Sequence, residues 1–569
     1  MNPQPSNKYI PIPGMTIRFQ APVRFQTAVR RRNLTGYGLS ALETRQKRGS
    51  LFLCWIWAVF LGLIAPISSR AGKNDVESRL RADIEYLCKP ELEGRDVPGL
   101  GGDLTALWLA NQMLDLGLRP GVGDSSFLQS FPLVTARLDT TQSILSISIA
   151  GRESVLNWGD GFYYFPQGTI PLNKVYKAVD CGYGLDDDQL NRHDFSRAEP
   201  GAIGVVLSGS DIPLIGASAR AALIPFKAAA AKRAGLNALI ILFDRDKNDG
   251  LPTEIIEKYE NVTKFQISLP QSSPDFPIFY LDTQHSTAKF LKENLSPSRS
   301  SVENDSFSII EEIKVHPQIV SAGASETSGF NVLGYFPGES AEIVILCAHY
   351  DHEGAAGQAK DGRPLYYPGA DDNASGVAAL LELCRRWSKQ PRPNRGLLVL
   401  GVAAEEDGLL GSKFFVQSHP ELKKQIVAAV NLDMIGRAGF ANMRDARDST
   451  RKPDPDYIAV YYSGAAPKLR DLIRGAQDRS DLNVNATPVN GFRFSDAGSF
   501  HAAGLPAVHI FGGFHPDYIK LTDTPDKIDY AKLARTVDLV EQLLQNLIQE
   551  PQTIEFDPTL KVEGSKMPY

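Results

Sequence analysis

The chain of 569 residues is 43% hydrophobic and 22% charged, which is typical of a globular protein and excludes wholesale disorder. At about 150 residues per domain, its length predicts several domains. The net charge of −6 is unevenly distributed, because residues 1–71 hold ten Lys or Arg and a single acidic residue. The rest of the chain is acidic, and this argues against nucleic-acid binding.

Residues 1–71 form a basic leader that ends in an apolar run, Leu51–Ile67, without a charged side chain. A basic region, an apolar core and small residues after it are the elements of a secretory signal, so we expect export to the periplasm or the extracellular space. Two alternatives stay open. Residues 51–67 reach the roughly 17 residues that span a bilayer and could be a membrane anchor, with the rest of the chain outside the cytoplasm. They could also be a buried core helix.

The five cysteines are widely spaced and include no C-x-x-C pair. Neither a disulfide framework nor a structural zinc knuckle is therefore predicted. Cys347 and Cys384 stand among apolar residues in the sequence and are expected to be packed thiols.

After the leader, residues 75–118 carry apolar side chains at intervals of three and four, which predicts two helices joined by a loop at Leu92–Arg95. Further along, short β-like segments are separated by turn residues, with one helix at Pro225–Ala234. We divide this half into residues 75–150, the first part of the main domain, and residues 151–324, an inserted β-rich α+β accessory domain.

Residues 325–550 alternate between strand-like and helix-like segments. The predicted strands are Ile343–Cys347, Leu397–Ala403, Val427–Leu432 and Ala507–Phe511, and the predicted helices are Ser375–Trp387 and Tyr530–Gln549. Such alternation indicates an α/β fold with a mostly parallel or mixed sheet flanked by helices. Residues 551–569 are left as a C-terminal tail.

Four short polar blocks stand out within under ninety residues of this main domain. They are A-H-Y-D-H at 348–352, G-A-D-D-N-A-S-G at 369–376, A-A-E-E at 403–406 and N-L-D-M-I-G at 431–436. The blocks follow or close apolar, strand-like runs. Because ligands bind at the carboxyl ends of strands in open α/β sheets, the blocks predict an active-site edge.

The residue types in the blocks indicate a metal site. His349 and Asp351 lie two apart at a strand end, which suits an imidazole ligand with a carboxylate behind it. Asp372 stands in a tight loop before a helix, where a carboxylate is also a common N-cap. Glu405 and Glu406 are adjacent acids after an apolar strand, so one can bind metal while the other moves protons; a solvated acidic pair is the alternative.

Asp433 completes the set, since an acid flanked by apolar residues needs a cation or strong donors as its partner. One imidazole and three carboxylates give mixed nitrogen and oxygen donors, which suit zinc, whereas carboxylates alone favour magnesium or calcium. A carboxylate shared by two metals would create a site able to activate water and polarise a carbonyl.

The blocks, their order and their spacing resemble the co-catalytic zinc aminopeptidases, a family that also contains glutaminyl cyclases and the transferrin receptor. The resemblance covers about residues 75–130 and 325–550, and residues 165–290 resemble the protease-associated domain inserted in many members. It implies Glu405 as the general base and Asp351 as the carboxylate behind a metal-bound imidazole, and we predict these two as the catalytic residues. The implied zinc ligands are His349, Asp372, Glu406 and Asp433.

The chain departs from the family pattern at one position. The family's last zinc ligand is a His in D-Y-H, shortly before D-T-P-D-K-I, and here Ile519 stands in its place. The resemblance therefore implies one intact zinc position, with His349, Asp372 and Asp433, and a second that lacks its imidazole. His515 swinging in, a weak or absent second zinc, and loss of activity are the three outcomes that follow.

The leading hypothesis is an exported or membrane-tethered zinc-dependent aminopeptidase that hydrolyses N-terminal residues from peptides, with a weakened second metal site. A catalytically impaired binding protein, using residues 165–290 for protein contacts, is the alternative from another class. Glutaminyl cyclisation is a third hypothesis, and the inserted domain argues against it.

Overall fold

The structure is a computed structural model that describes residues 67–562 apart from several internal stretches, which are 122–124, 165–172, 188–191, 197, 209–223, 245–265, 269–275, 295–312 and 493–494. The predicted signal or anchor segment lies almost entirely outside the described residues. Among the helices that are described, none has the length and apolar character required to cross a bilayer.

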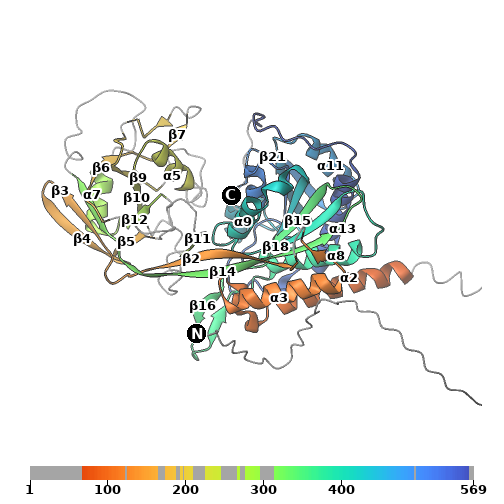
Figure 1. The fold of residues 1–569 in the computed structure, drawn as a ribbon. Helices are drawn as coiled ribbons and strands as arrows, with labels where there is room; N and C mark the ends of the chain where they lie inside the picture. Colours follow the sequence, from red (N-terminus) through yellow and green to blue (C-terminus); the bar gives the residue numbers. More distant parts are fainter. Residues whose placement is uncertain are drawn as a thin grey trace, which may run out of the picture. The chain divides into compact units, whose positions relative to one another are not determined.

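Ten of the described strands form one mixed sheet (Figure 1). Its order is β11 (Gln266–Ser268), β2 (Leu128–Leu138), β14 (Ser321–Phe336), β18 (Gly396–Val402), β15 (Ile343–His349), β19 (Ile426–Asp433), β22 (Ala507–Phe511), β20 (Tyr457–Ser463) and β21 (Asn483–Val489), with β1 (Arg119–Pro120) beside β14. The four central strands β18, β15, β19 and β22 run parallel to one another. Strands β14 and β20 flank this centre in the antiparallel direction.

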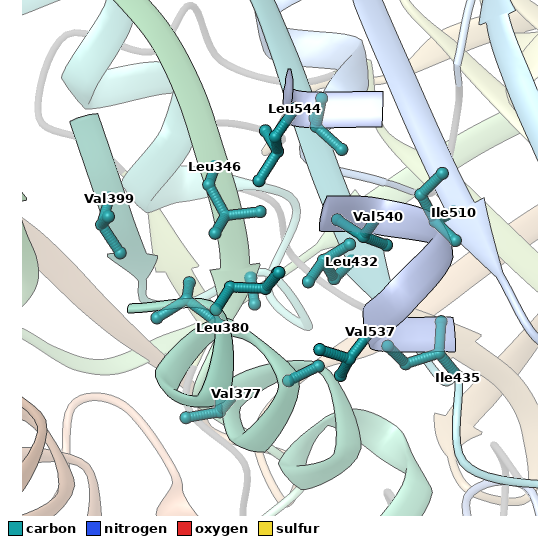
Figure 2. Packing of buried hydrophobic residues seen from close by; sticks show 14 of the residues in the cluster. Leu346, Val377, Leu380, Val399, Leu432, Ile435, Ile510, Val537, Val540 and Leu544 are labelled. Carbon is teal, nitrogen blue, oxygen red and sulfur yellow. The ribbon is translucent and has the colours of Figure 1, made fainter. Parts of the chain in front are cut away.

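The central strands are buried along their whole length because both faces of the sheet are covered. In β15, Val344 and Leu346 belong to one core cluster, whereas Ile343, Ile345 and Cys347 belong to the other. Side chains alternate between faces along a strand, so each strand contributes to both cores. Figure 2 shows the first core, in which Leu346 lies with residues of the covering helices.

Helices pack on each face of the sheet. Apolar residues of α2 (Ile67–Leu87), α3 (Leu100–Asp115), α8 (Gly376–Trp387), α11 (Lys468–Gln477) and α13 (Tyr530–Gln549) form the first core with the sheet. Those of α9 (Leu410–Ser418), α10 (Met443–Arg447) and α12 (Ala497–Ala502) form the second. The predicted α/β class, with a mixed sheet flanked by helices, is confirmed.

The accessory region contains a closed barrel of eight described strands. In barrel order they are β10 (Ala238–Phe243), β12 (Ile278–Asp282), β5 (Gly161–Tyr164), β4 (Arg152–Trp158), β3 (Ile144–Ile149), β13 (Lys314–Gln318), β6 (Tyr176–Asp180) and β9 (Ile203–Leu207). The helices α5 (Ile224–Arg233) and α7 (Ser286–Asn294) pack against barrel strands. The first barrel strand therefore begins seven residues before residue 151, where the sequence suggested a boundary. Apolar alternation alone does not say which sheet a strand joins.

Shorter elements complete the described chain. They are the hairpins β7 (Asp186–Asp187) with β8 (Arg192–His193) and β16 (Ala355–Gln358) with β17 (Pro364–Tyr366), the turns η1 (Pro90–Arg95), η5 (Pro420–Lys424) and η6 (Pro525–Lys527), and the wider helical turn η4 (Ala370–Ser375). The turn η4 leads directly into α8 and carries Asp372. It is the only one of these elements that contributes a predicted ligand.

Candidate metal centre

The four polar blocks meet at the carboxyl edge of the parallel strands, as the sequence predicted. Strand β15 ends at His349 and the neighbouring strand β19 ends at Asp433. The pair Glu405 and Glu406 follows the end of β18, and Asp372 reaches the same edge from η4. Parallel pairing brings strand ends together because all carboxyl ends point the same way.

A first cluster of ligand-type side chains consists of His349, Asp372 and Asp433, all of them buried. The His349 Nε2 atom lies 3.3 Å from Asp433 Oδ1 and 3.6 Å from Asp372 Oδ1. On the other side of the ring, Nδ1 faces Asp351, at 3.8 Å from its Oδ1 and 3.3 Å from its backbone oxygen. The imidazole thus presents Nε2 to the carboxylates and Nδ1 to Asp351, as a metal-binding histidine with an acidic partner does.

Strong electrostatic coupling marks this cluster. Burial raises the pKa of Asp351 to about 7, although His349 opposes the shift. Burial also raises the pKa of Asp372 well above its usual range, and the carboxylate of Glu406 adds to this. For His349, burial lowers the pKa, but the carboxylates of Glu405 and Asp433 outweigh it and raise the pKa well above its ordinary value.

A second cluster consists of His352, Asp372 and Glu406. The His352 Nδ1 atom lies 2.8 Å from Glu406 Oε1 and 3.8 Å from Asp372 Oδ2. Sequence reasoning did not assign a role to His352, although it is the last residue of the A-H-Y-D-H block. The strand ends at His349, so the alternation of a strand does not tell where the next side chains point.

The segment around Ile519 takes no part in either cluster. His515, which was considered as a replacement ligand, has its Nε2 atom 3.3 Å from Oδ2 of Asp371, the neighbour of the shared ligand. Asp517 pairs with Arg437 at 2.8 Å and holds the segment in place. Neither described ligand cluster includes His515 or a residue from this segment.

Glu405 lies partly exposed beside both clusters. Desolvation by the surrounding protein raises the pKa of its carboxyl group well above the ordinary value; the charge of His349 opposes this shift, and the carboxylates of Asp496 and Glu406 add to it. A carboxylate with a raised pKa holds a proton more readily, which suits a group that accepts and returns protons.

Tyr518 is another residue that sequence reasoning left without a role. Burial and the nearby carboxylates of Asp372 and Glu406 raise the pKa of its phenol well above the ordinary value. Its hydroxyl group therefore stays protonated at neutral pH and is a neutral hydrogen-bond donor near the clusters.

The donor set fits a divalent cation. Buried carboxylates repel one another unless a positive charge compensates them, and Asp351, Asp372 and Asp433 are all buried here. Each cluster offers one imidazole nitrogen with two carboxylate oxygens. Mixed nitrogen and oxygen donors suit zinc better than magnesium or calcium. Ligand clusters of this kind, at the carboxyl edge of an α/β sheet, define a metal-dependent hydrolase.

Comparison with known proteins agrees with that class. Residues 331–544 match peptidase family M28. The chain is 31% identical over 291 residues to the Escherichia coli protein YfbL, which is uncharacterised, and the match spans 46% of this chain and 86% of YfbL. It is 27% identical over 219 residues to a probable leucine aminopeptidase of Trichophyton verrucosum, spanning 37% of this chain and 55% of the fungal protein.

Among solved structures, the fold is similar to an aminopeptidase from Aneurinibacillus sp. strain AM-1, with a TM-score of 0.52 and 20% identity over 85% of this chain and 96% of that one. The chain belongs to peptidase family M28, as its sequence blocks indicated. It is thereby a hydrolase of the metallopeptidase class, in agreement with the class of enzyme predicted from the sequence.

Proposed function

We propose that this protein is a zinc-dependent aminopeptidase that removes N-terminal residues from peptides. The observation that carries the proposal is the pair of ligand clusters sharing Asp372, with Glu405 beside them. The name of the fungal relative, a probable leucine aminopeptidase, supports an N-terminal specificity. The donor chemistry supports zinc.

His349, Asp372 and Asp433 would hold one zinc ion, with Asp351 behind the imidazole. Bound zinc supplies Lewis-acid chemistry, which polarises a carbonyl group and makes water a stronger nucleophile at neutral pH. The backbone oxygen of Asp351 accepts the Nδ1 proton of His349 at 3.3 Å, so that Nε2 would remain free to bind the metal.

Glu405 would move the proton of the reaction. It accepts a proton from the attacking water as the water oxygen bonds to the scissile carbonyl carbon. It then donates that proton to the nitrogen of the leaving amine as the carbon–nitrogen bond breaks. Its position, partly exposed beside both ligand clusters, allows contact with the metal centre and with solvent.

Two further assignments accompany the proposal. We propose that the barrel region, predicted over residues 151–324, is an accessory domain of the protease-associated kind inserted in the catalytic domain. We also propose export or membrane tethering through residues 51–67, on the basic and apolar pattern of the leader.

A substrate test separates an exopeptidase from its alternatives. We expect zinc-loaded protein to hydrolyse leucyl p-nitroanilide and a leucyl dipeptide with a free amine. The same substrates carrying an N-acetyl group should be hydrolysed at least tenfold more slowly. Equal rates would indicate an endopeptidase, whereas no hydrolysis of a broad panel of aminoacyl substrates would favour the catalytically impaired binding protein.

A further inference from the structure

We infer that His352 is the imidazole ligand of a second metal ion, so that the centre holds two metals bridged by Asp372 although residue 519 is an isoleucine. The inference rests on the proposed function, because it concerns the same site. It assigns the missing ligand to the loop that follows β15 and not to the segment around Ile519.

The orientation of the Asp372 carboxylate supports a bridging role. Its Oδ1 atom is 3.6 Å from Nε2 of His349, and its Oδ2 atom is 3.8 Å from Nδ1 of His352. Each oxygen therefore faces a different imidazole. A carboxylate in this orientation can donate one oxygen to each of two metals, which is how two-metal sites are bridged.

The second cluster has the same composition as the first. His352 has a side chain with 0% exposure, and Glu406 stands next to it with 14% exposure. One imidazole nitrogen and two carboxylate oxygens lie within 4.8 Å of one another in both clusters. A simple hydrogen bond between His352 and Glu406 would leave the nearby charge of Asp372 poorly compensated, whereas a divalent cation offsets both acids.

Arg95 holds the two loops that deliver these ligands. Its guanidinium group is buried and donates to the backbone oxygen of Tyr350 at 2.9 Å, and to those of Pro368 and Gly369 at 2.7 and 2.9 Å. The backbone oxygen of Arg95 in turn accepts the N–H of His352 at 3.4 Å. One buried cation thus fixes the loop of His352 against the loop of Asp372.

The segment around Ile519 supports the centre without binding metal. The Asp523 Oδ2 atom accepts the backbone N–H groups of Asp371 and Asp372 at 2.9 and 3.2 Å. His515 contacts Asp371, and Asp517 pairs with Arg437. These contacts position the shared ligand through its backbone, so the segment keeps a role that does not require an imidazole at position 519.

Metal counting on the full-length protein tests the inference. Protein stripped by a chelator and reloaded with zinc or cobalt is separated from free metal, and the bound metal is counted by atomic emission. We expect two metals per chain in the natural protein and one in His352→Ala and in His352→Gln. The Ile519→His variant should bind two metals, with the same affinity for the second as the natural protein.

Folding and specificity controls accompany the count. His419 is a partly exposed histidine that pairs with Glu421 and belongs to neither cluster, so His419→Ala should keep two metals. Retention of the first metal and an unchanged circular dichroism spectrum show that the His352 variants fold. If these variants also lose the first metal, the cobalt-loaded natural chain is examined instead. Two different sites should give different absorption bands at half-loading and at full loading.

Two results would overturn the inference. One is a His352→Ala protein that keeps two metals with unchanged affinity. The other is a natural protein that binds one metal while Ile519→His binds two. A protein that binds two metals through His352 but hydrolyses no aminoacyl substrate would refute the proposed function and leave the ligand assignment intact, so the two failures are distinguishable.

Discussion

The two ligand clusters share Asp372 but are built by different means. In the first, His349 and Asp433 are the last residues of two neighbouring strands whose register pairs Cys347 with Asn431. In the second, His352 and Glu406 come from loops beyond the strand ends. Hydrogen bonds of the sheet position the first pair of ligands, whereas contacts such as those of Arg95 position the second. The comparison teaches that a strand end is a rigid support for a ligand, while a loop needs a support of its own.

The largest effect is expected from removing what the clusters share. Asp372→Asn takes a charged oxygen from each cluster, so both metals should be lost and hydrolysis should fall below detection. Metal content after reloading and the rate with leucyl p-nitroanilide measure this. If the variant lost only one metal, Asp372 would belong to a single site, and the two clusters would not share it.

Glu405→Gln should have the next largest effect, and it should act on the reaction without affecting either cluster. Removing a general base costs typically about 10²–10⁴-fold in rate. We expect a loss of that size in kcat, while the metal content of the variant equals that of the natural protein. Parallel loss of metal would instead make Glu405 a ligand.

Asp351→Asn should affect the first cluster and leave the second unchanged. The carboxylate of Asp351 lies 3.8 Å from Nδ1 of His349, and loss of such a charge behind a metal-binding imidazole typically weakens metal affinity by roughly 10–100-fold. Its Oδ2 atom also accepts the backbone N–H of Glu406 at 3.3 Å, and an asparagine can still accept this bond. We therefore expect the first metal to bind more weakly and the second to bind as before, measured by competition with a chromophoric chelator. Equal weakening of both would argue that the clusters do not act separately.

The smallest effect on the comparison of the two clusters is expected from the strand framework beneath the first one, because it changes the stability of the fold and not a ligand. Burial lowers the pKa of His509, on β22 next to β19, to about 4. Between about pH 6.5 and pH 4 the unfolded chain takes up a proton that the folded chain does not, so stability falls as the pH falls through this range. At about 1.4 kcal/mol per pKa unit, the loss reaches roughly 3 kcal/mol at pH 4.

The His509→Gln variant should lose less stability between pH 6.5 and pH 4 than the natural protein. Urea unfolding of the metal-free proteins, followed by fluorescence, measures this without a contribution from metal release. His193, whose side chain is about half exposed, provides a matched control variant, His193→Gln. Identical slopes for all three proteins would contradict the assignment of a buried neutral imidazole at position 509.

Much of the fold and of the first cluster was predictable from the sequence. The strand β22 and the helix α13 were predicted at their observed bounds, Ala507–Phe511 and Tyr530–Gln549, because strand-like and helix-like patterns are local properties of the sequence. His349 and Asp433 close strand-like runs, and their meeting follows from parallel pairing. The accessory barrel was less predictable, because β3 (Ile144–Ile149) resembles a strand of the main sheet in its apolar pattern but pairs with β4 and β13.

The sequence by itself determined the class of fold, the family and the four polar blocks, because strand periodicity and block spacing are local properties of the chain. Only the tertiary structure brought His352 to Glu406 and Asp372, while His515 faces Asp371. The direction of a loop side chain depends on what holds the loop, here the buried Arg95 from a distant part of the chain. Such long-range contacts leave no pattern in the residues around the ligand.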